Sequence, residues 1–260
     1  MRHRERMRHL ATDARRKFSR FKKDDPNAVR DLKMEEGLMA TLVKEWMAFV
    51  NLAKGVNELN AETKLLHSAS QAGKGIVCSA KDIKEFCGLV EKYSVAFDES
   101  VLNNLGIETG TGFFLSALIN QSPDEHFVIP KAISFANYLC YRNTKNVIIE
   151  GQFNSALGAE MKQGTIYVMW GPGESLGLDM EGGVIIAAGD YPGSLGGEMR
   201  GGMIVVRGNV TLNPYDNFLQ NMQGGEVHIY GEIIENGGTL DPELIEGGKV
   251  YVRGKLIVDK

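Results

Sequence analysis

The second half of the chain places apolar residues at alternate positions in short segments that recur at a regular interval. Residues two apart on a strand share a face, so an apolar pair in each segment faces one side. The first apolar column is Val147, Ile166, Ile185, Ile204, Val227 and Val250, and the second is Ile149, Val168, Ala187, Val206, Ile229 and Val252. The pattern predicts six equivalent β-strands with these columns in the interior.

Other residue types recur with the same interval. Leu157-Gly158, Leu176-Gly177 and Leu195-Gly196 are 19 residues apart, and a methionine column and a glycine column keep the period. The columns are Met161, Met180, Met199 and Met222, and Gly164, Gly183, Gly202, Gly225 and Gly248, with steps of 23 residues in the last two turns. Hairpins would reverse every second strand, whereas a constant interval requires parallel stacking. We therefore expect a coil of about six turns, with methionine filling irregular space inside it.

Glycine also follows most of the strands. It stands six positions after the start of five repeats, at Gly151, Gly189, Gly208, Gly231 and Gly254. Glycine at such a place allows a positive φ or a tight corner that a β-carbon would forbid. These residues are therefore interpreted as corners of the coil.

The first half has the pattern of α-helices. Asp24-Asp25-Pro26 predicts a helix start, and the helix should run toward Ala53. Its apolar stripe is Leu38, Met39, Leu42, Val43, Trp46, Met47 and Val50. Further helices are expected over 61–71, from Ser79 with Asp82 in its first turn, over 98–105 and over 113–120. The chain thus divides into a basic arm (1–24), a helical domain (25–126) and the repeat domain (127–260).

The repeat resembles a known family. The units at 176–183 and 195–202, LGLDMEGG and LGGEMRGG, and the continuation IVVRGN at 204–209 are similar to the glycine-rich repeat of two modules. These are the C-terminal domain of the glutamate synthase large subunit and the C subunit of formylmethanofuran dehydrogenase. The resemblance covers about residues 127–260 and implies that they form a right-handed parallel β-helix. Together with the helical pattern of the first half, the expected fold is mainly β with an α-rich N-terminal half. It also implies a structural role within an oxidoreductase complex and no catalytic residues or cofactor of the chain's own.

The outward positions of the middle strands are apolar, which is unusual for a solvent-facing strand. They are Tyr167, Val184, Ile186, Met203 and Val205. Parallel sheets with two apolar faces are normally covered on both. The covering element is the chain's own Trp46 helix, a second copy or a partner subunit, and the apolar patch should end near Gly225. Two aromatic residues of an inserted loop, Tyr215 and Phe218, are further candidates for partner contact.

Candidate binding sites are weaker. Glu160, Asp179 and Glu198 share one repeat position and would form a ladder of carboxylates, which could recruit a cation or be neutralised by Lys162 and Arg200. The glycines of 171–177 are interpreted as a corner and not as a phosphate loop, because no helix follows them. No metal or cofactor is assigned to the chain.

Charge and cysteine content add two expectations. Residues 1–23 hold ten Lys and Arg against two acids, although the whole chain has a net charge of −4. This arm could bind an anionic partner, nucleic acid or a membrane surface, or it could be a solvated or partner-docked extension. Three scattered cysteines and the lack of a membrane-spanning stretch favour a cytoplasmic protein.

The sequence therefore favours a non-catalytic assembly subunit. The alternative is an enzyme or a small-molecule or metal-binding module that uses the acidic ladder or the glycine corners.

Overall fold

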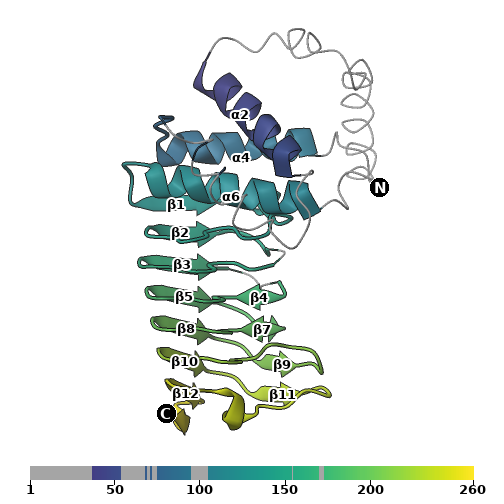
Figure 1. The fold of residues 1–260 in the computed structure, drawn as a ribbon, viewed down its shortest axis with the longest axis vertical. Coiled ribbons are helices and arrows are strands. Elements are labelled where there is room, and N and C mark those ends of the chain that lie inside the picture. The colour runs from purple at the N-terminus through teal and green to yellow at the C-terminus, as the bar shows by residue number, and fades with distance from the viewer. Residues whose placement is uncertain are drawn as a thin grey trace.

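The computed structural model describes residues 37–53, 68, 71, 75–94, 105–153, 155–169 and 173–260. Within these residues, helices gather at one end of a column of stacked strands (Figure 1). The helices are α2 (Leu38–Ala53), α4 (Ala80–Ser94) and α6 (Leu105–Gln121). The predicted order of a helical part followed by a parallel β-solenoid of about six turns is confirmed.

One sheet forms the longest wall of the solenoid. Its strands, in order, are β1 (His126–Ile129), β2 (Asn146–Ile149), β3 (Thr165–Val168), β5 (Val184–Ala187), β8 (Met203–Val206), β10 (Glu226–Ile229), β12 (Lys249–Val252) and β13 (Lys255–Asp259). The first seven are parallel, and β13 turns back antiparallel to β12. Val147 pairs with Ile166 and Ile166 with Ile185, so the predicted columns stack in register. β1 is an additional rung that precedes the six strands predicted from the repeat.

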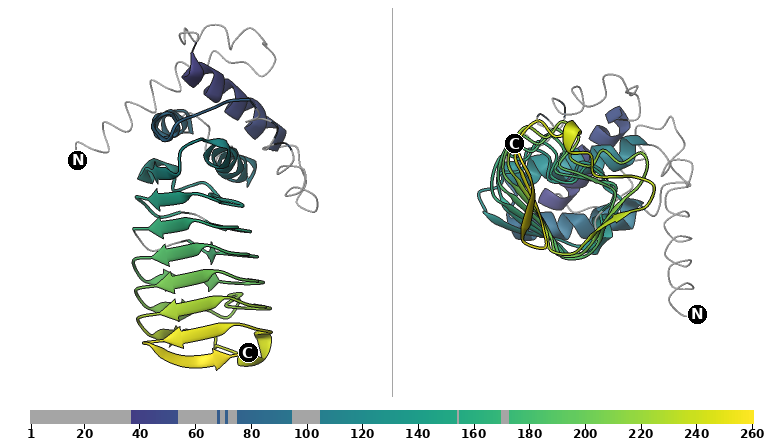
Figure 2. Two further views of the ribbon diagram at one scale, coloured as in Figure 1. Left: turned by 90° about the vertical axis from the view of Figure 1, so that its left-hand side faces the viewer. Right: turned by 90° about the horizontal axis from the view of Figure 1, so that it is seen from below.

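Two shorter sheets complete each turn. One contains β4 (Ser175–Leu176) and β7 (Ser194–Leu195), and the other contains β6 (Tyr191–Pro192), β9 (Val210–Leu212) and β11 (Ile233–Glu235). Two 3₁₀ turns, η3 (Lys131–Ile133) and η4 (Pro242–Leu244), lie between strands. The view along the axis in Figure 2 shows the turns closing around a common interior. The methionine column lies in that interior, fully buried.

The corner glycines are required mainly by close packing between turns. A β-carbon on Gly231 would lie 2.4 Å from the carbonyl oxygen of Gly208, and one on Gly208 would lie 2.5 Å from the backbone nitrogen of Asp190. Gly254, in the tight turn between β12 and β13, has a positive φ of 74°. Glycine was expected at these corners either for a positive φ or for lack of room for a β-carbon. Lack of room is the reason at Gly208 and Gly231.

The three helices form a cap over β1. Trp46, Phe86 and Phe114 are buried between them, and the indole Nε1 of Trp46 donates to Thr111 Oγ1 at 3.0 Å. At the start of α4, Ser79 and Asp82 form the predicted cap, because the Ser79 backbone N–H donates to the Asp82 carboxylate at 2.9 Å. The Asp82 N–H donates back to the Ser79 hydroxyl at 3.2 Å. The N-terminal signal of this helix is confirmed.

The short helix expected over 113–120 is part of a longer one. α6 continues through Gly110 and Gly112, and a β-carbon on Gly112 would lie 1.7 Å from the carbonyl oxygen of Asn137. The glycine that weakened the helical pattern therefore serves the contact between α6 and the first turn of the solenoid.

Several predicted segments lie outside the described residues. They are the basic arm (1–24), the helix start at Asp24-Asp25-Pro26, most of 61–71 and most of 98–105. Among the helices that the structure does describe, none has the length and apolar character needed to cross a membrane.

Candidate functional site

The outward face of the long sheet carries a central column of mostly apolar side chains. Strand pairing places them in register, one on each rung. The column is Val128, Ile148, Tyr167, Ile186, Val205, His228 and Tyr251, and Leu256 of β13 pairs with Tyr251. Ile148 and Leu256 are exposed, and the other members are half-buried. Alternation along each strand predicts that these side chains point outward. The residues next to them on β3, β5 and β8, which are Ile166, Ile185 and Ile204, are buried in the interior and confirm this orientation.

Apolar residues also flank the middle of this column. Val184 and Met203 precede it on β5 and β8, and Met169 and Tyr230, exposed by 47% and 66%, follow the ends of β3 and β10. Polar residues lie around them, mostly toward the two ends of the face but with Arg207 at the end of the central strand β8: Asn146, Glu150, Thr165, Arg207, Glu226, Lys249 and Arg253. An apolar centre with a polar rim is the usual composition of a protein–protein interface. We call this set the outward face.

The described helices do not cover the outward face. α2 packs on α6 and α4, above β1, and Figures 1 and 2 show all three helices at the end of the column. Trp46 is buried within this cap. Of the three elements considered as covers, the helix that bears Trp46 is therefore excluded, while a second copy and a partner subunit remain.

The aromatic character of the face continues past Gly225, where the apolar patch was expected to end. His228 stacks on Tyr251 with ring centroids 4.5 Å apart and an angle of 11° between the rings. Arg207 lies over the ring of Tyr167 at 5.7 Å. The sequence pattern alone did not reveal that Tyr251 and Leu256 extend the column below His228.

The inserted loop contributes one exposed aromatic residue. Tyr215 is 95% exposed, whereas Phe218 is buried at 8%. The prediction that Phe218 is available at the surface is wrong, because it belongs to the hydrophobic core of the solenoid. Contact through Tyr215 stays a prediction.

The three acidic residues of the ladder occupy one corner of successive turns. Glu160, Asp179 and Glu198 have φ angles of 51°, 53° and 54°, in the left-handed region. In each case the backbone N–H donates to a carbonyl of the following turn, as from Glu160 to Leu178 at 2.8 Å. Non-glycine residues rarely adopt this conformation. The corner geometry is thus shared, as the constant spacing predicts.

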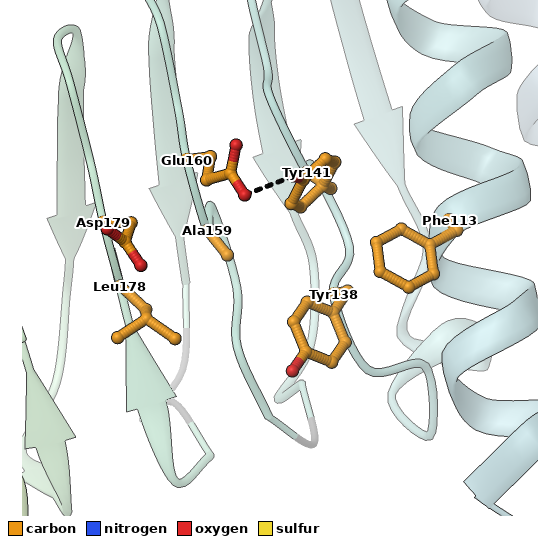
Figure 3. Close-up of a pocket in the computed structure, with 7 residues that line it drawn as sticks. All are labelled: Phe113, Tyr138, Tyr141, Ala159, Glu160, Leu178 and Asp179. Carbon is orange, nitrogen blue, oxygen red and sulfur yellow. Dashed lines mark hydrogen bonds between the residues drawn. The ribbon is translucent and has the colours of Figure 1, made fainter. Parts of the chain in front are cut away.

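Ion pairs and hydrogen bonds occupy much of the ladder. Glu160 accepts from the Tyr141 hydroxyl (Figure 3). Its other carboxylate oxygen lies 2.8 Å from Arg142 Nε. Burial opposes ionisation of Glu160, but these donors outweigh it and lower its pKa. Asp179 pairs with Arg200 at 2.6 Å, yet burial, followed by the charge of Glu198, raises its pKa.

A small cavity lies beside this edge. It has a volume of about 40 Å³, room for roughly three water molecules. Figure 3 shows its walls, which come from α6 and from three turns of the solenoid. The lining residues are Phe113, Tyr138, Tyr141, Ala159, Glu160, Leu178 and Asp179. Within the described ranges, no group of three or more His, Cys, Asp or Glu side chains is placed to hold a metal ion.

The remaining candidate residues are structural. Within 171–177, of which 171 and 172 lie outside the described residues, the chain forms strand β4, and no helix follows it. Cys78, Cys87 and Cys140 are free and buried, and burial raises the pKa of Cys87 to about 12. Thiols in such surroundings are poor nucleophiles at neutral pH.

Comparison of the chain with protein-family models, with curated proteins and with solved structures gives no match. The functional argument therefore rests on the geometry of the chain itself.

Proposed function

We propose that this chain is a non-catalytic structural module that assembles with other protein chains through the outward face of its solenoid. The observation that carries the proposal is the in-register column of Ile148, Tyr167, Ile186 and Val205, which remains partly exposed beside a fully buried interior. Parallel sheets in proteins are normally covered on both faces. A contiguous apolar surface of this kind usually marks an interaction site.

The resemblance of the repeat to modules of glutamate synthase and formylmethanofuran dehydrogenase supports a more specific form of this proposal. In that form the assembly is an oxidoreductase complex, and the chain organises catalytic subunits without performing the reaction. The rigid stack of rungs suits this role, because strand-to-strand pairing fixes every outward side chain relative to its neighbours.

Metal or small-molecule binding at the acidic edge has less support. Arg142 and Arg200 already neutralise Glu160 and Asp179, and the adjacent cavity holds only a few water molecules. We therefore keep this function as the alternative, tested by metal titration of the full chain.

The apparent mass of the tagged full chain, cross-linked in its source cells before lysis so that dilution does not separate weakly bound chains, tests the proposal. We expect the wild-type chain to elute well above its monomer mass of 28.6 kDa, and an Ile186→Arg variant to elute as a monomer. Thr211→Arg on β9, a half-buried position between two buried residues of another wall, is the matched control and should leave the assembly intact. Elution of the wild-type chain as a monomer, or an unchanged assembly with Ile186→Arg, would overturn the proposal.

A further inference from the structure

We infer that the occupant of the outward face is a second copy of this chain, inverted end over end. This inference rests on the proposed function and names the partner at the same face. The two-fold axis runs along the strand direction and passes between β5 and β8. In this arrangement β5 of one copy faces β8 of the other, β3 faces β10, β2 faces β12, and β1 faces β13.

The centre of the arrangement brings apolar residues together. Ile186 of one copy lies opposite Val205 of the other, and Val184 lies opposite Met203. Both pairs occur twice because a two-fold interface is self-complementary. These four residues are half-buried in the isolated chain, and their neighbours on the interior side are fully buried. Covering them removes the apolar surface that the fold leaves in contact with water.

Apolar matching extends to both ends of the face. Met169 lies opposite Tyr230, and both are exposed in the isolated chain, by 47% and 66%. Ile148, exposed by 43%, lies opposite Tyr251. Val128 of the first rung lies opposite Leu256 of the last, which strand pairing places beside Tyr251 on the same face.

The polar residues at the ends of the face are also complementary. The axis places Glu150, after β2, opposite Arg253, after β12, and His126 opposite Asp259. Thr165 meets Glu226, and Asn146 meets Lys249. Opposite charges therefore face each other and like charges do not, which fixes orientation more than it adds affinity.

Other arrangements of the same face match less well. Moving the axis onto β8 places Val184 opposite Glu226, and moving it onto β5 places His126 opposite Lys249. Turning the axis along the solenoid places Lys249 opposite Arg253. The proposed register contains one pairing of an apolar residue with a charge, Ala188 after β5 opposite Arg207 after β8, whereas each alternative contains more such pairings or brings two basic groups together. The sequence of outward residues thus favours one register.

The size of the face fits a dimer that exchanges with monomer. Eight rungs of about 4.8 Å and five residues of about 3.3 Å give a flat footprint of roughly 630 Å² per copy. The two copies together bury roughly 1,270 Å², close to the lower end of specific interfaces at about 1,200 Å². We therefore expect dissociation in the micromolar range, on the order of 1–100 μM.

Cross-linking of introduced cysteines with a short bis-maleimide tests both the partner and the register, because facing sheets pack about 10 Å apart and a disulfide cannot bridge that gap. In the full chain, Ile148→Cys and Tyr251→Cys are five rungs apart, about 24 Å, too far to join within one copy. Across the proposed axis they face each other. The three native cysteines are buried and do not compete. With a bis-maleimide whose spacer matches the gap between the two sheets, we expect the double variant to form a covalent dimer.

The register control is the double variant Ile148→Cys with Val205→Cys. In the proposed dimer these positions are two rungs out of alignment, about 10 Å, so we expect at least a tenfold slower cross-link. Equal cross-linking by both double variants would overturn the register. No cross-link, with wild-type sedimentation as a monomer at about 100 μM, would overturn the dimer itself.

These outcomes are separate from those of the proposed function. A purified chain that is monomeric, while the assembly in cell extract still depends on Ile186, would overturn the dimer and leave the structural-module proposal standing. An Ile186→Arg variant without effect in either measurement would overturn both.

Discussion

The terminal methyl of Met180 lies 2.7 Å from the point where a β-carbon on Gly202 would stand. The same relationship joins Met161 to Gly183 at 2.6 Å and Met199 to Gly225 at 2.6 Å. The methionine of one turn thus packs over the glycine that opens the strand of the next turn. The two columns that the sequence shows separately are one interlocking feature of the interior, and it explains why both keep the same period.

Gly202→Ala should destabilise the chain by about 2–4 kcal/mol. The substitution places a β-carbon against Met180 and forces alanine into a φ of +87°. Denaturant unfolding followed by circular dichroism measures the change. The matched control is Gly88→Ala, on the exposed side of α4, where a β-carbon meets nothing within 4 Å. We expect that control to gain about 0.5–1 kcal/mol, since glycine weakens a helix interior; equal losses in both variants would contradict the interlock.

Glu198→Asn should stabilise the chain by about 0.5–1 kcal/mol at neutral pH. Glu198 is exposed with a φ of 54°, a conformation that asparagine tolerates better, and Asn221 already occupies the same corner with the same φ. Its charge also raises the pKa of Asp179, after burial, so ionised Asp179 costs stability above that pKa.

Comparison with Glu198→Gln separates the two contributions, because glutamine removes the charge and keeps the unfavourable backbone preference. Its gain should be smaller and should disappear in acid, where both carboxyls are protonated in any case. Thermal unfolding at two pH values provides the measurement, and a loss of stability in Glu198→Asn would refute the assignment.

Glu160→Gln should destabilise the chain by about 1 kcal/mol at neutral pH. The folded protein lowers the pKa of Glu160, so its ionised form contributes stability that is present above the unfolded pKa. That contribution is lost as pH falls through the lowered pKa, and the two proteins should then converge. Urea unfolding across this range, with Glu85→Gln on the exposed side of α4 as the control, follows the convergence. A difference independent of pH would show that Glu160 acts through packing alone.

Ser79→Ala should cost about 1 kcal/mol because it removes the hydroxyl that caps α4 and leaves Asp82 with one fewer donor. Side-chain and backbone hydrogen bonds from Ser79 are the main cause of the lowered pKa of Asp82, so that pKa should rise in the variant. Carboxyl chemical shifts in a pH titration measure the pKa. Lys84→Ala, on the exposed side of the same helix, should leave both the pKa and the stability nearly unchanged.

The solenoid was predictable because few residue types can occupy the positions that repeat on every turn. The interior columns, such as Ile166, Ile185 and Ile204, must be apolar on every turn, and Gly183 and Gly202 have positive φ angles. The apolar and glycine positions therefore recur at a regular interval in the sequence. The first rung lies outside the predicted repeat because Phe127 precedes Val147 by 20 residues, and no glycine of the repeat stands before it.

The cap and the face were less predictable. α6 contains Gly110 and Gly112, which weaken any helical pattern, and only the contact with Asn137 shows why Gly112 is needed. Phe218 was expected at the surface because it lies in an inserted loop. The sequence does not show that the chain re-enters the core at this residue. The complementarity of Ile148 with Tyr251 requires strand order and register, which the pairing of each rung supplies.

The most direct test of the account is the rate of oxidation of Met203 by dilute peroxide in the native full chain. Met203 lies on the outward face, half-buried in the isolated chain, whereas Met180 lies in the interior with no exposed surface. The account predicts that Met203 is protected in the wild-type protein and reacts several-fold faster in Ile186→Arg, while Met180 stays protected in both. A Met203 that reacts equally fast in the two proteins would contradict the claim that another chain covers this face.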